Sequence, residues 1–126
     1  MPRLSATFTV TTHPGEPLPG AWNRFALAKT WQGDLDGRSE GLMLTAGDPA
    51  SGGAGYVATE IFEGTLDGRR GRLTLQQLGT MTDGEPALHY VIAPGSGTEE
   101  LAGTTGTVTI DGIGDDGVHQ VTLDLD

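Results

Sequence analysis

Glu60 is the side chain of this sequence with the clearest capacity for acid–base chemistry. It lies in the alternating run Tyr56–Leu66, where it shares one face with Tyr56 and Phe62. Because that face is apolar, we expect it to point inward, where a carboxylate is costly unless it is paired or protonated. Glu60 is therefore predicted to be a catalytic acid or base, or to anchor a ligand. The alternative is a structural carboxylate bonded to Gln77, a tyrosine or an inward arginine.

His119 is the second candidate catalytic residue. It begins the last alternating run and shares a face with Val121 and Leu123, so it could relay protons or orient a ligand. The alternative is a position at the rim of the fold. His13 and His89 are expected to be solvated, and the three histidines lack the paired spacing of a metal site. We therefore expect neither a catalytic metal nor a bound cofactor.

A set of aromatic and polar side chains could line an internal cavity. Gln77 shares a face with the apolar side chains of its run and is the leading candidate for the partner of Glu60. The alternative for the large side chains is a packed core, and both can hold if one end of the fold is filled and the other open. The predicted ligand-binding residues are Glu60, Gln77, Trp31, Tyr56, Phe62 and Tyr90, with Trp22 and Met43 as further apolar lining.

Composition limits the partners of the chain. Its formal net charge of -10 argues against binding to nucleic acid or to anionic membranes, both of which require basic surfaces. The sequence has no cysteine, and none of its runs approaches the roughly 18 apolar residues of a membrane-spanning helix. The first residues lack the apolar core of a signal peptide. We therefore expect a cytoplasmic protein with one domain over residues 1–126.

A repeated sequence motif indicates how the chain is divided into strands. Gly33–Arg38 (GDLDGR) returns as Gly64–Arg69 (GTLDGR), and Leu101–Gly106 is a looser copy. Asp-Gly between alternating runs is a strong hairpin signal, because glycine adopts the positive φ of such turns at no steric cost. The predicted turns fall at Asp36-Gly37, at Asp67-Gly68 and near Gly103.

Eight short runs alternate apolar and polar residues, and none has the period of a helix. This pattern predicts an all-β fold, an antiparallel eight-stranded up-and-down barrel of lipocalin-like architecture, with a two-sheet sandwich as the alternative. Lys29 is the odd, charged member of the face that it shares with Phe25, Leu27, Trp31 and Leu35. The side chains predicted to point inward are Phe8, Leu27, Trp31, Leu42, Leu44, Phe62, Leu73, Leu75, Val108 and Leu123, and those predicted to point outward are Thr7, Thr9, Thr74 and Thr109.

Several segments together resemble DUF3224, a bacterial family of unknown function. They are Tyr56–Glu60, Gly64–Gly71, Leu75–Gly79 and above all Ala93–Gly103 (APGSGTEELAG), with His119–Asp124 as the closing strand. The resemblance spans nearly the whole chain and implies a barrel like that of allene oxide cyclase. It implies no established reaction. Two residues depart from the family pattern, because Gln77 stands where a histidine is usual and Val121 where an aromatic residue is usual.

Three functions are compatible with these features. The first is a barrel that binds and carries a small apolar molecule in its interior. The second is an enzyme, a cyclase or isomerase that folds a flexible unsaturated substrate inside the barrel, where shape and one or two polar groups suffice. The third is an interaction protein with a filled core that works through its surface, for example as a homo-oligomer.

Overall fold

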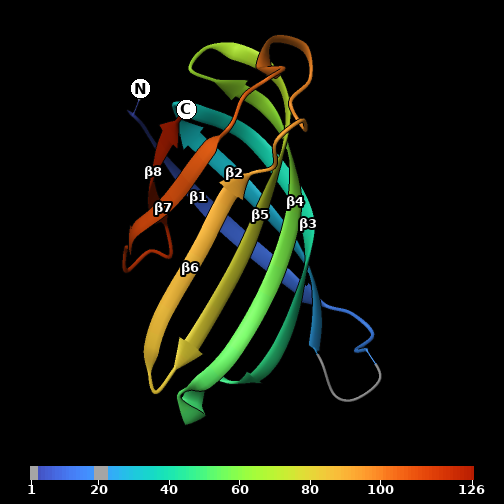
Figure 1. The fold of residues 1–126 in the computed structure, drawn as a ribbon, viewed down its shortest axis with the longest axis vertical. Helices are drawn as coiled ribbons and strands as arrows, with labels where there is room; N and C mark the ends of the chain where they lie inside the picture. The colour runs from blue at the N-terminus through green and yellow to red at the C-terminus, as the bar shows by residue number, and fades with distance from the viewer. Residues whose placement is uncertain (1–2, 19–22) are drawn as a thin grey trace.

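The fold is a closed antiparallel barrel in which each strand pairs with the next and the last pairs with the first (Figure 1). The computed structural model describes residues 3–18 and 23–126. Alternation of apolar and polar side chains forms these strands, since one face of each is buried and the other is solvated. The strands are β1 (Arg3–Pro14), β2 (Asn23–Gly33), β3 (Leu35–Asp48), β4 (Gly53–Leu66), β5 (Arg69–Thr82), β6 (Glu85–Ile92), β7 (Gly106–Ile113) and β8 (His119–Leu125), with short 3-10 helices η1 (Pro49–Ser51) and η2 (Glu99–Leu101).

The observed turns agree only in part with those predicted from the repeated sequence motif. Asp67-Gly68 joins β4 to β5 with positive φ at both residues, 51° and 79°, which confirms that prediction. The turn predicted at Asp36-Gly37 is wrong, because the chain already turns at Asp34, between β2 and β3. Gly37 lies inside β3 and is paired with Gly64 of β4. The two copies of the repeated motif therefore do not form equivalent turns; instead, residues 35–37 of the first pair with residues 64–66 of the second on the neighbouring strand.

One end of the barrel is filled by a hydrophobic core. Leu101 of η2 is completely buried and closes this end over β5. The segment containing η2 crosses the upper end of the barrel in Figure 1. The inward predictions for β1, β2, β4, β5, β7 and β8 are confirmed by the buried side chains Phe8, Leu27, Trp31, Phe62, Leu73, Leu75, Val108 and Leu123.

The predicted orientation of β3 is wrong by one residue. Leu42 is 42% exposed and Leu44 lines a hollow on the outer surface, whereas Ser39 points inward and is 2% exposed. Gly41 lies opposite Glu60, and a Cβ atom there would approach the Thr59 carbonyl oxygen to 2.0 Å. The inward position of β3 at this level therefore requires glycine, and the apolar residue next to it points outward.

The other end of the barrel is open, because strands β6 and β7 separate there. Their pairing is limited to Val91 with Thr107 and Ile92 with Gly106, next to the closed end. Strands β3, β4 and β5, of 14 residues each, continue beyond that level, whereas β7 has 8 residues and β8 has 7. Figure 1 shows the resulting divergence of β6 from β7 toward the lower end.

Candidate functional site

The open end of the barrel contains a cavity of about 1080 Å³. Its walls are mainly apolar side chains and backbone from β2–β7, and they extend between the separated strands β6 and β7. Tyr56 lies at its inner end, and Asp48 is the one charged side chain among the described residues that line it. Leu88 and Ile113, on the two sides of the opening, are 38% and 62% exposed.

Tyr56 forms the polar floor of this cavity, and Gln77 is its hydrogen-bonded neighbour. The Tyr56 hydroxyl donates a hydrogen bond of 2.8 Å to Gln77 Oε1 on the adjacent strand. The Tyr56 ring fits over Gly79, where a Cβ atom would come within 2.2 Å of the ring. Burial, and secondarily the negative charge of Glu60, raise the pKa of Tyr56, which keeps its hydroxyl protonated at neutral pH.

Glu60 lies deeper than this floor, in a buried network of hydrogen bonds. It is 1% exposed and two inward positions beyond Tyr56 along β4. Its Oε1 accepts bonds from Lys29 Nζ at 2.8 Å and from the Tyr90 hydroxyl at 2.6 Å, and its Oε2 accepts one from Ser39 Oγ at 2.5 Å. The predicted inward position is confirmed, but the predicted partner Gln77 is wrong because its amide is bonded to Tyr56.

Lys29 is the cation that balances Glu60. It is 5% exposed, donates a second bond of 3.0 Å to the Tyr90 oxygen, and places Nζ 4.3 Å from the centre of the Phe8 ring. Burial lowers the pKa of Lys29, and the charge and hydrogen bond of Glu60 oppose this shift. The sequence signal for this partner was the single charge on the inward face of β2.

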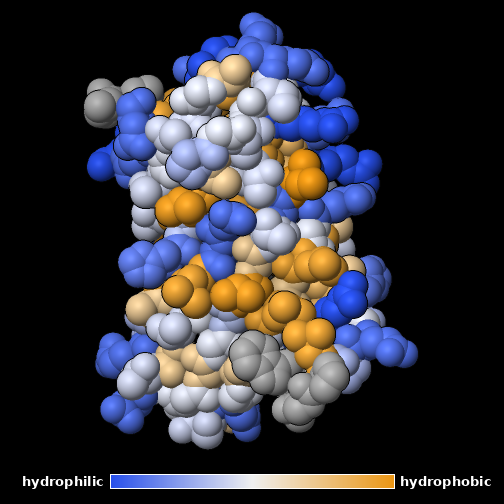
Figure 2. Space-filling view, turned by 45° about the vertical axis from the view of Figure 1, so that its right-hand side comes forward, coloured by the Kyte–Doolittle hydropathy of each residue, from blue (hydrophilic) through white to orange (hydrophobic). Residues whose placement is uncertain are grey.

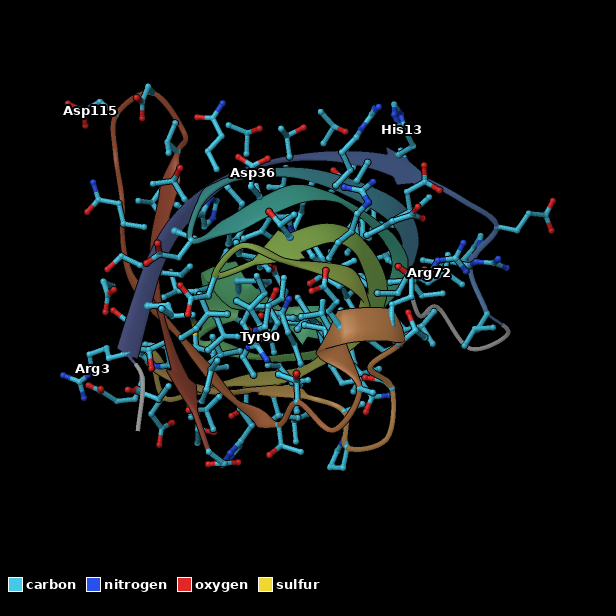
Figure 3. All side chains as sticks on the ribbon, turned by 90° about the horizontal axis from the view of Figure 1, so that it is seen from above. Arg3, His13, Asp36, Arg72, Tyr90 and Asp115 are labelled. Carbon is cyan, nitrogen blue, oxygen red and sulfur yellow. The ribbon has the colours of Figure 1, made fainter. Side chains whose placement is uncertain are left out.

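Tyr90 and Trp31 complete the network. Figure 3, which looks along the barrel, shows Tyr90 in the interior. Burial and the negative charge of Glu60 raise the pKa of Tyr90 well above its usual value, so its hydroxyl remains a donor. Trp31 Nε1 donates to Ser39 Oγ at 3.1 Å. Both oxygens of Glu60 are therefore held by neighbouring donors, an arrangement that fixes the carboxylate in place.

His119 lies beside this network on β8. Its ring stacks on Phe8, with centroids 4.4 Å apart and planes inclined by 13°. Burial lowers the pKa of His119 and the positive charge of Lys29 adds to this effect, while the backbone of Gly117 opposes it. Within residues 3–18 and 23–126, no side chain or backbone group forms a hydrogen bond of ordinary geometry with its buried Nδ1 atom. The neutral ring is thus favoured in the fold.

The predicted ligand-binding residues occupy three levels of the barrel. Tyr56 lines the cavity, and Gln77 is its bonded neighbour. Glu60 and Tyr90 lie below, in the buried network. Trp31 and Phe62 belong to the packed core, at 1% and 0% exposure. Trp22 lies outside the described residues.

The outward-facing side of β3, β4 and β5 has an apolar strip. It comprises Leu42, Leu44, Val57, Ile61 and Leu78, and Leu44, Val57 and Leu78 are cross-strand neighbours. Figure 2 shows hydrophobic side chains gathered on this side of the molecule. A hollow of about 610 Å³ overlies part of the strip, with Leu18 and Arg24 also at its edge.

Two kinds of feature are absent from the described residues. No helix in them is long and apolar enough to cross a membrane. Nor do three or more histidine or acidic side chains gather anywhere in residues 3–18 and 23–126 in a group that could hold a metal ion.

Comparison with known proteins gives a family but no activity. The family model of DUF3224, described as a protein of unknown function, matches residues 4–125. A similar solved structure is a DUF3224 protein of unknown function from Shewanella oneidensis MR-1. It is 38% identical, with a TM-score of 0.92, and the match covers 100% of this chain and 96% of that one. No curated protein matches.

Proposed function

The chain belongs to the DUF3224 family, and we propose from the geometry of its barrel that it binds a small, largely apolar molecule in the open end. The observation that carries this proposal is the cavity of about 1080 Å³ between Tyr56 and the opening of β6 and β7. A cavity of this size with mainly apolar walls and a few polar groups at one end is typical of small-molecule sites.

The hydrogen bonds of the buried network favour a binding protein over an enzyme. A cyclase or isomerase requires a group that exchanges a proton with the substrate or stabilises charge on it. Lys29, Ser39 and Tyr90 all donate to Glu60, below the floor of the cavity. These bonds support a role for Glu60 in holding the cavity floor, whereas an enzyme that uses Glu60 would have to break them first.

A binding titration with a cavity-filling variant tests this proposal. N-phenyl-1-naphthylamine, an uncharged probe that fluoresces in apolar surroundings, is expected to bind the wild-type protein saturably with one site. Ala54 lines the cavity from β4, so Ala54→Trp is expected to weaken binding at least tenfold. Thr109→Trp, on the outward face of β7 and away from both the cavity and the outer hollow, is the matched control and should bind normally. Equal binding by all three proteins would contradict the proposal.

The outer apolar strip favours self-association as a second candidate function. Val57 and Ile61 are 46% and 58% exposed on a continuous sheet surface, and such patches commonly mark interfaces. Arg38, Glu63 and Arg72 lie next to one another across the strands beside the strip, where Arg72 pairs with Glu63 of the same chain at 3.3 Å. Sedimentation velocity tests this: Val57→Lys should convert a dimer to a monomer, and a wild-type protein that is monomeric at high micromolar concentration would rule it out.

A further inference from the structure

The charges around the cavity define the class of molecule that it accepts; this inference rests on the proposed function. Among the described residues that line the cavity there is no lysine or arginine, and Asp48 is the one charged side chain. Asp83 and Glu85, at the adjoining β5–β6 turn, add negative charge near the mouth. An anionic head group would therefore meet no cation in the cavity and like charges at its entrance.

The buried Lys29 does not serve as a counter-ion for a ligand. Its ammonium group is bonded to Glu60 at 2.8 Å and to Tyr90 at 3.0 Å, and it lies against the Phe8 ring. The pair Lys29–Glu60 is neutral as a whole and lies below the floor. A charged head group of either sign would be desolvated at the floor without a free partner of opposite charge, which is costly.

The floor does offer hydrogen bonds to an uncharged group. Tyr56 lines the cavity and donates to Gln77, so the lone pairs of its oxygen remain able to accept a bond from a ligand hydroxyl. At the opposite end, Leu88 and Ile113 continue the apolar wall to the surface between β6 and β7. An extended apolar chain would cover these two exposed side chains.

We propose that the site takes an uncharged, elongated lipophile with a hydroxyl group, held with that group at Tyr56 and its apolar chain leading out between β6 and β7. The proposal excludes fatty-acid anions as preferred ligands, because a carboxylate would meet like charges at the entrance and no lysine or arginine among the lining residues. It specifies a chemical class and an orientation, whereas the proposed function requires only that some apolar molecule binds.

Competition by three compounds with the same twelve-carbon chain and different head groups tests the chemical class of the ligand. Dodecan-1-ol, dodecanoate and dodecyltrimethylammonium, each below its aggregation concentration, compete with N-phenyl-1-naphthylamine. The alcohol should displace the probe at a concentration about tenfold or more below that of dodecanoate. It should also act below the concentration of dodecyltrimethylammonium, whose head group could lie only at the acidic entrance. Displacement by either ion as effective as by the alcohol would overturn the proposal while leaving the proposed function intact. If the probe does not bind at all, the proposed function fails and this inference with it.

A substitution of Tyr56 tests the orientation of the ligand in the cavity. Tyr56→Phe removes the hydroxyl and keeps the ring over Gly79, so dodecan-1-ol should bind about fivefold more weakly, the worth of one ordinary hydrogen bond. The affinity for N-phenyl-1-naphthylamine, whose diarylamine N–H is only a weak donor, should fall by less than that for the alcohol. Retained binding of this probe also verifies that the variant is folded. An unchanged affinity for the alcohol, or an equal loss for both compounds, would overturn the orientation.

Discussion

Removal of Lys29 should destabilise the barrel more than any change to its surface charges. Lys29→Met keeps an unbranched apolar side chain of similar length but deletes the ammonium group, which donates bonds of 2.8 Å to Glu60 and 3.0 Å to Tyr90. Glu60, at 1% exposure, would be left as an uncompensated buried charge. Breaking one side of a buried ion pair costs about 3–5 kcal/mol, a large part of the roughly 5–15 kcal/mol that stabilises a domain.

The assay is urea unfolding at pH 7, followed by circular dichroism and by tryptophan fluorescence. The double variant Lys29→Met with Glu60→Gln should recover about 2 kcal/mol or more, because the unpaired charge is then absent. Arg3→Met is the control, since the ion pair Arg3–Asp124 is 75% and 42% exposed and such surface pairs contribute little to stability. A Lys29→Met protein within about 1 kcal/mol of wild type, or a double variant no more stable than the single one, would refute the reasoning.

Three further predictions concern the register of the strands and the ionisation of His119. Gly41→Ala should lower the free energy of unfolding by about 1–3 kcal/mol, because its Cβ would overlap β4, whereas Gly53→Ala meets no atom within 4 Å and should be neutral in the same urea assay. Leu42→Thr should change the free energy of unfolding by about 0.5 kcal/mol or less, whereas Leu75→Ala, at a fully buried position, should lower it by about 2–5 kcal/mol. Equal losses of stability in the two variants would contradict the outward orientation of Leu42. Because the pKa of His119 is lowered in the fold, the stability it contributes is present above the unfolded value of about 6.5 and is lost as the pH falls through the folded value. Thermal unfolding from pH 8 to pH 5 should therefore show a smaller loss for His119→Phe than for wild type, and parallel curves would contradict this.

The barrel and most of its core followed from the sequence because alternation is a local signal. Each run of apolar and polar residues specifies a strand and its buried face, and an even number of antiparallel strands can close without free edges. The exception was β3, where Leu42, Met43 and Leu44 are apolar on both faces. There the orientation is decided by the contact of Gly41 with β4, which connects residues far apart in the chain.

The Asp-Gly dipeptides illustrate the limit of a local rule. Asp67-Gly68 and Asp83-Gly84 both form hairpin turns with positive φ at each residue. Asp36-Gly37 has the same sequence but lies within the first residues of β3, where Gly37 is paired with Gly64. Glycine serves tight turns and close strand contacts equally well, so the dipeptide alone does not distinguish them. The turn at Asp83-Gly84 was not anticipated.

The candidate site was predicted only in outline. The inward position of Glu60 follows from alternation along β4, but its partner Lys29 belongs to β2, which is not an immediate neighbour of β4. Contacts across the interior depend on the stagger of the strands around the barrel, which no single run of residues specifies. The cavity likewise results from the separation of β6 from β7, a feature of strand pairing.

A crystal structure of the protein soaked with 12-bromododecan-1-ol tests the central claim most directly, because bromine is located by its anomalous scattering. The account predicts one bromine peak near the opening between Leu88 and Ile113, with the hydroxyl density beside Tyr56 at the inner end of the cavity. Bromine confined to the outer hollow around Leu42 and Val57, with no density in the open end of the barrel, would contradict it.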